Sequence, residues 1–263
     1  MLAVRNDQLE ALRAPTQARF EADTLSHLAR FYPVDAASLG EAGLLAVIRE
    51  GQRDAVARAF TLAGDVRRFI TLRMVLGSGF PRDPLLPWAA RIVAEGQGQP
   101  GTVSRLVVEA ADYLELTSGE DGQYALRAML RAEAVTFDQA TGIGLETTST
   151  GEAADTALLA LLRRIWPQKY RLTRPEQRAA FLRAAATAAA ADGLDTPGTA
   201  RLCTVLMFLL GAGFANDPAL PWARAALAAV PDDAPAIDRA RALYDAGMAA
   251  IARLRVLLPA VGA

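Results

Sequence analysis

A fourteen-residue segment that occurs twice constrains this chain more than any other feature. Residues 76–89 read Leu-Gly-Ser-Gly-Phe-Pro-Arg-Asp-Pro-Leu-Leu-Pro-Trp-Ala, and residues 210–223 read Leu-Gly-Ala-Gly-Phe-Ala-Asn-Asp-Pro-Ala-Leu-Pro-Trp-Ala. Ten of the fourteen positions are identical, and the copies are 134 positions apart. We name them the first motif (76–89) and the second motif (210–223). Their repetition indicates that the chain contains two copies of one structural unit.

The same offset of 134 positions extends well beyond the two motifs. It holds without a gap from the pair Pro33/Pro167 to the pair Trp88/Trp222. Further identical pairs are Arg49/Arg183, Gly64/Gly198, Arg67/Arg201 and Leu72/Leu206. We therefore predict a tandem duplication, with a first unit over 1–134, a linker over 135–151 and a second unit over 152–263. Two such units most simply pack as a pseudo-twofold pair, as the subunits of closed homodimers do.

Composition and periodicity predict an all-α fold. Hydrophobic residues make up 52% of the chain and aromatic residues only 6%, and much of the hydrophobic share is Ala, a strong helix former. Apolar residues recur at helical spacing in several segments. The expected helices include 5–31, 65–76, 102–116, 124–134, 202–210 and 234–258. Residues 202–210 are apolar almost all round, which predicts a central, buried helix.

Local signals predict where several helices begin and end. Gly77 and Gly79 should end the helix before the first motif, because glycine accepts the backbone geometry of a helix C-terminus. Capping boxes are expected at 38–41 and 173–176, and Thr196 followed by Pro197 should begin another helix. Residues 135–151 lack a helical period, and we expect an irregular linker that could include a short extended piece.

The charge balance and the cysteine count exclude several classes of protein. Basic and acidic residues number 28 and 29, and no basic stripe stands out, which argues against nucleic-acid binding. Cys203 is the only cysteine, so an intrachain disulfide is excluded. The first residues lack the apolar core of a signal peptide, and no run approaches the length of a membrane span. We expect a cytoplasmic protein without membrane insertion.

The sequence offers little catalytic apparatus. His27 is the only histidine and its counterpart is Leu161, whereas Cys203 corresponds to Phe69. Both residues are therefore expected to have packing or surface roles, and we expect no metal site and no cofactor. The Gly77-Ser78-Gly79 stretch lacks the Gly-Lys-Ser/Thr of a phosphate-binding loop and follows a helix instead of a strand.

The motifs supply the candidate site residues. Asp83 and Asp217 each precede a proline, which suits capping of a turn better than general acid–base catalysis. Trp88 and Trp222 could anchor a partner, but we favour a role in closing the core of each unit. The candidate partner-binding or structural residues are Phe80, Asp83, Trp88, Phe214, Asp217 and Trp222.

These residues resemble a known family. The stretch His27-Leu28-Ala29-Arg30-Phe31-Tyr32-Pro33 and the Asp-Pro-x-Leu-Pro-Trp core of the motifs are similar to uncharacterised small helical proteins of type VI secretion gene clusters in Gram-negative bacteria. The likeness covers roughly residues 9–94 and, more weakly, 158–229. Three departures stand out. Pro81 and Ala215 replace the first Asp of the family's Phe-Asp pair, the arginine that follows the leucine is displaced, and the second copy lacks the histidine.

The resemblance implies a non-enzymatic accessory protein of type VI secretion. It would be an adaptor or chaperone that binds a toxic effector or a component of the secretion spike. An immunity protein that neutralises one cognate toxin is the alternative. An enzyme is a third hypothesis, and it would need a cleft with perturbed titratable groups that the sequence does not indicate.

Overall fold

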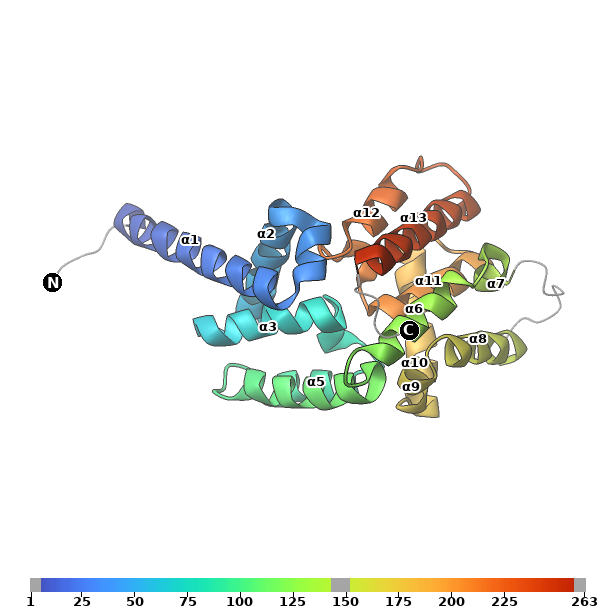
Figure 1. Cartoon of the computed structure of the whole chain (residues 1–263), viewed down its shortest axis with the longest axis horizontal. Coiled ribbons are helices and arrows are strands. Elements are labelled where there is room, and N and C mark those ends of the chain that lie inside the picture. Colours follow the sequence, from blue (N-terminus) through green and yellow to red (C-terminus); the bar gives the residue numbers. More distant parts are fainter. Residues whose placement is uncertain (1–5, 143–151, 258–263) are drawn as a thin grey trace.

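The structure is a computed structural model that describes residues 6–142 and 152–257. Every regular element in these two ranges is a helix, so the predicted all-α class is confirmed (Figure 1). The helices of residues 6–76 and 102–118 gather on one side of the molecule. Those of residues 197–257 gather on the other, joined there by the helices of residues 123–141 (Figure 1).

The helix boundaries repeat with the offset seen in the sequence. The first half comprises α1 (Asn6–Phe31), α2 (Pro33–Ala57), α3 (Ala63–Leu76), η1 (Phe80–Arg82), α4 (Pro87–Glu95) and α5 (Thr102–Ser118). Two helices follow, α6 (Gln123–Glu133) and α7 (Phe137–Thr141). The second half comprises α8 (Glu152–Ile165), α9 (Pro167–Arg171), α10 (Pro175–Ala191), α11 (Pro197–Leu210), η2 (Phe214–Asn216), α12 (Pro221–Ala228) and α13 (Ala236–Leu257). Thus α3, η1, α4 and α5 each begin 134 residues before α11, η2, α12 and α13.

Proline and glycine explain the shared boundaries. Pro33 and Pro167 stand at the first position of α2 and α9, where a missing N–H does no harm. Inside α2, Gly40 has a φ of 65° and bends the helix at the expected capping box. The corresponding position in the second half, Arg174, is the N-cap of α10. One prediction was off by a residue, because Arg174 and not Thr173 caps α10.

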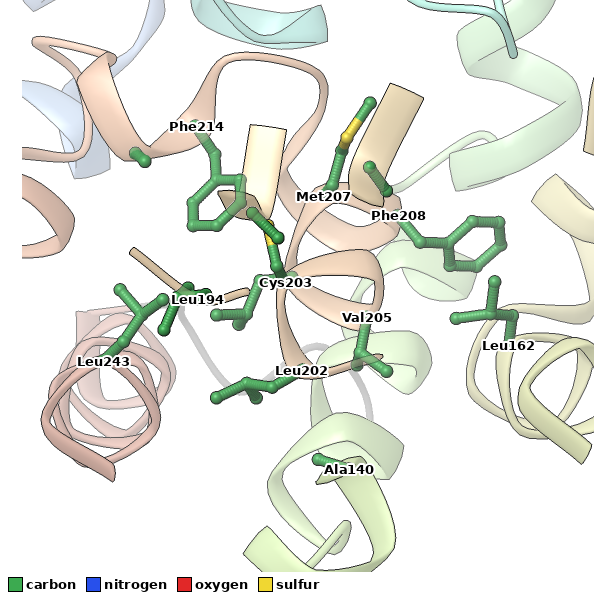
Figure 2. Packing of buried hydrophobic residues seen from close by; sticks show 14 of the residues in the cluster. Ala140, Leu162, Leu194, Leu202, Cys203, Val205, Met207, Phe208, Phe214 and Leu243 are labelled. Carbon is green, nitrogen blue, oxygen red and sulfur yellow. The ribbon is translucent and has the colours of Figure 1, made fainter. Parts of the chain in front are cut away.

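The predicted start of α11 is confirmed. Pro197 is its first residue, and the Thr196 hydroxyl accepts a hydrogen bond from the Thr199 N–H at 3.4 Å. This cap satisfies one of the N–H groups that the first turn of a helix leaves without a partner. The helix is buried as expected, and Figure 2 shows Cys203 facing Leu194 and Phe214 while Phe208 points toward Leu162. Burial raises the pKa of Cys203 to about 12, so its thiol is an inert part of the core.

Two hydrophobic cores form, one around α3 and one around α11. Each motif contributes a residue to the core of the other half. Leu85 of the first motif packs into the second core, and Ala219 of the second motif packs against the first core. The two halves are therefore interlocked at their motifs.

Residues 135–142 differ from the irregular linker that we expected. They contain the short helix α7, capped at Thr136, and α7 packs on α11. Val135, Phe137 and Ala140 are buried in the second core, where Figure 2 shows Ala140 below α11. Burial of the Phe137 ring stabilises a segment too short to hold a helix by its own hydrogen bonds. The rest of the expected linker, 143–151, lies outside the described residues.

An ion-pair cluster in the first half has no equivalent in the second. The Arg73 guanidinium is buried, pairs with both Glu50 and Asp54, and donates to the Ser78 carbonyl oxygen at 3.1 Å. It thereby ties α3 and α2 to the first motif. The corresponding residues of the second half are Met207, Ala184 and Ala188, an apolar set.

We predict that Arg73→Met lowers the free energy of unfolding by about 3 kcal/mol, because Glu50 loses its cation and Asp54 keeps only its pair with Arg58. Adding Glu50→Ala and Asp54→Ala, which gives positions 50 and 54 the small residues of the second half, should recover part of that loss, although Arg58 then loses its pair with Asp54. Urea unfolding of the single and triple variants measures both effects. A triple variant no more stable than Arg73→Met would contradict the prediction.

Candidate functional site

The two motifs touch backbone to backbone at their glycines. Gly77 and Gly211 have φ values of 91° and 92°, which other residues rarely adopt. A Cβ atom on Gly77 would lie 2.8 Å from the Leu210 carbonyl oxygen, and one on Gly211 would lie 2.6 Å from that of Leu76. No side chain fits in either place. This close crossing explains why glycine occupies these positions in both copies.

Asp83 joins the first motif to the second. Its buried carboxylate accepts one hydrogen bond within its own turn, from the Leu85 N–H at 2.8 Å. It accepts another across the molecule, from the Ala212 N–H at 3.3 Å. The turn cap was predicted from the sequence, whereas the bond to the other half was not.

Asp217 makes the corresponding two hydrogen bonds, one within the second motif and one to the first motif. It accepts from the Ala219 N–H at 2.8 Å and from the Ser78 N–H at 2.7 Å. Ser78 and Ala212 are themselves a pair at the offset of 134. Each aspartate thus caps its own turn and holds the other motif, which assigns both residues a structural role.

The aromatic residues of the motifs fall into two groups. Phe80 and Phe214 are buried in the first and second cores. Trp88 and Trp222 are only partly buried, although each packs against the core of its own half. The indoles are therefore the members of the candidate set that have accessible surface and a side chain suited to anchoring a partner.

The two indoles have different neighbours. Trp88 packs on the ring of Tyr113 in α5, with 6.3 Å between ring centroids. At the corresponding place in α13 the chain has Gly247, and a Cβ there would lie 3.4 Å from Trp222. The space that Tyr113 fills in the first half is thus left vacant beside Trp222.

A groove opens at this place. Its larger part lies between the start of α2, the start of α12 and the end of α13, and its smaller part lies between α6, α11 and α13. It consists of a cavity of about 170 Å³ that continues into a hollow of about 740 Å³. We name the two together the Trp222 groove. Both parts are lined by Leu220, Trp222, Ala250 and Leu254. The combined volume is in the range of binding sites for small molecules or for a few side chains of a peptide.

Larger side chains stand at the sequence counterpart of the Trp222 groove, and we name that region the closed side. Leu85, which corresponds to Ala219, packs into the second core. The indole of Trp166, a residue that also lines the smaller cavity of the Trp222 groove, donates from Nε1 to the Thr117 carbonyl oxygen at 2.8 Å and ties the start of α9 to α5. Where the first half has Leu85 and Tyr113, the second half has Ala219 and Gly247. The second half therefore has less side-chain volume at these positions. The groove was missed from the sequence, but these unequal pairs in the aligned halves were a signal for it.

Charge also differs between the closed and the open side. Lys169 is buried on the closed side and donates to the Phe208 carbonyl oxygen at 2.6 Å, whereas its counterpart Asp35 lines the Trp222 groove. Burial lowers the pKa of Lys169 and raises that of Asp35. Burial likewise raises the pKa of Asp83, and the nearby Lys169 ammonium opposes that rise. Arg253 contributes a cation to the groove.

His27 and Cys203, for which the sequence predicts packing or surface roles, lie in different halves. His27 is in α1 and Cys203 is in α11. Within the described ranges, 6–142 and 152–257, no group of three His, Cys, Asp or Glu side chains is placed to hold a metal ion. The helices of those ranges are also too short or too polar to cross a membrane.

Comparisons with known proteins add no relative, since no family model, curated protein or solved structure matches the chain.

We predict that Gly247→Ala raises the free energy of unfolding by about 0.5–1 kcal/mol, because alanine favours the helix and the new methyl makes ordinary contacts with Trp222. Gly51→Ala is the matched control, since its Cβ would lie only 2.6 Å from the Ile70 side chain and should lower stability. Thermal unfolding of both variants measures the effects. Destabilisation by Gly247→Ala would show that the space beside Trp222 is already filled.

A second prediction concerns pH. An acid whose pKa is raised in the folded state makes stability fall as pH rises above its unfolded pKa. Lys169→Met removes the charge that restrains the pKa of Asp83. The free energy of unfolding should then fall more steeply as pH rises above about 4, the ordinary pKa of an aspartate, than in the wild type. Adding Asp83→Asn should abolish the extra fall, and an unchanged slope in Lys169→Met would contradict the prediction.

Proposed function

We propose that this protein is a non-enzymatic binding protein of type VI secretion, an adaptor or chaperone that holds an effector or a spike component in the cytoplasm. The proposal includes the pseudo-twofold arrangement of two units, in which one of two related interfaces has been closed and the other kept for a partner. The resemblance of the motifs to proteins of secretion gene clusters supports the secretion role.

The single observation that carries the binding role is the Trp222 groove. The Trp222 indole lines both of its parts, its aliphatic walls come from Leu220 and α13, and Asp35 and Arg253 supply one charge of each sign. Partly buried tryptophans in apolar surroundings are typical anchors of protein interfaces. Two charges of opposite sign would orient an extended or helical segment whose apolar side chains enter the groove.

Affinity purification of the tagged full-length chain from its native host, with mass spectrometry, tests the proposal. The decisive variant is Ala219→Leu with Gly247→Ala, which refills the groove without adding charge. The matched control is Ala90→Leu, a similar change on an exposed position of α4. Circular dichroism should show that all three proteins are folded.

We expect the wild type and the Ala90→Leu control to retain an effector together with a spike component, and the refilled variant to lose them. Retention of one toxin alone, through its toxic domain, would replace the adaptor role by immunity. A partner retained equally by the refilled variant would contradict binding at the Trp222 groove.

A further inference from the structure

A second groove lies on the first half, across α1, α3 and α5. Its volume is about 570 Å³, and none of its lining residues belongs to the Trp222 groove. We name it the α1–α3–α5 groove. The residues that matter here are His27, Phe31, Arg67, Val75, Val107 and Leu114.

The corresponding face of the second half is covered by the chain itself. There α7 packs on α11, and α6 packs on α8 and α13. The Tyr244 hydroxyl donates to the Val135 carbonyl oxygen at 2.8 Å, and the Arg241 guanidinium lies 3.5 Å from the centre of the Phe137 ring. A helical segment with an aromatic side chain thus occupies the counterpart of the α1–α3–α5 groove.

Exposure shows the difference between the two faces. Phe31 is 57% exposed at the edge of the α1–α3–α5 groove, whereas its counterpart Ile165 is fully buried. Val107 is 36% exposed, and its counterpart Arg241 is the residue that stacks on Phe137. The first half therefore has the apolar face that receives a helix in the second half, without the helix.

The charges of the groove define the chemistry of its occupant. The cations Arg67 and Arg68 line it beside His27, whose pKa is lowered by burial, and no described carboxylate does. Arg68 pairs with Asp65, whereas the Arg67 Nε is buried and has no partner among the described residues. The counterpart Arg201 also leaves Nε unpaired, but its Nη1 donates to the Ala154 carbonyl oxygen at 3.0 Å. A carboxylate on an incoming helix would pair with Arg67.

We propose that the α1–α3–α5 groove docks an amphipathic helix of a partner protein, with an apolar face for Phe31, Val75 and Val107 and a carboxylate for Arg67. This inference concerns a separate surface and does not depend on the secretion role. The partner helix would cover the first half as α6 and α7 cover the corresponding face of the second half.

A phage-displayed library of helical 16-residue peptides, selected against the full-length protein, tests the proposal. Selected peptides are synthesised, and their affinities are measured for the wild type, for Val107→Glu and for Val108→Glu. Val108 is 61% exposed and lies outside the groove, so it provides the matched control. Both substitutions are at accessible positions, and thermal melting checks that both variants remain folded.

We expect the selected peptides to carry Asp or Glu beside apolar residues spaced three and four apart. Their affinity should fall at least about tenfold for Val107→Glu and stay within about twofold for Val108→Glu. Recovery of no binders, of binders without acidic residues, or of binders indifferent to Val107→Glu would overturn the proposal. So would a dimer, seen by light scattering, that Val107→Glu dissociates, because a second copy would then occupy the groove.

Discussion

The structure depends on the place where the two motifs cross. The backbones approach so closely at Gly77 and Gly211 that a single added carbon would collide with the opposite chain. Asp83 and Asp217 then bind backbone N–H groups of the opposite half, and the Gly79 N–H donates to the Ala212 carbonyl oxygen at 3.0 Å. Charge-assisted bonds in a buried place are stronger than neutral ones and costly to leave unpaired. This requirement explains why identity between the halves is highest here.

Away from the crossing, the side chains of the two halves differ, and these differences produce the Trp222 groove and the α1–α3–α5 groove. One side carries large residues and is closed, with Tyr113 packed on Trp88. The other side carries Gly247 and Ala219 and forms the Trp222 groove. The face formed by α3 and α5 in the first half is open. The corresponding face, formed by α11 and α13 in the second half, is covered by α6 and α7. Each half therefore has one covered surface and one open surface, which suits a protein that binds through unlike sites.

The sequence was a good guide to local structure and a poor guide to contacts between the halves. The offset of 134 predicted corresponding helix boundaries, because Pro and Gly act on the backbone next to them. The turn caps of Asp83 and Asp217 were predicted for the same reason. Their second bonds depend on residues more than 120 positions away, which no local pattern encodes. Residues 135–142 were misjudged because tertiary burial of Phe137, and not helical periodicity, stabilises α7. The Trp222 groove was missed because it arises from side chains that are smaller in one copy. The α1–α3–α5 groove was missed because α6 and α7 cover its counterpart in the second half and no segment covers it in the first.

Native-state hydrogen exchange resolved by residue with NMR tests the central claim, that the motif crossing unites the two halves. The amide protons of Ser78 and Ala212 are the decisive probes, because each donates to the aspartate of the other half. We expect both to exchange only through global unfolding, with the same opening free energy as the central amides of α3 and α11. Exchange of these two protons at much lower free energy, while the cores of both halves stay protected, would show instead that the halves separate readily.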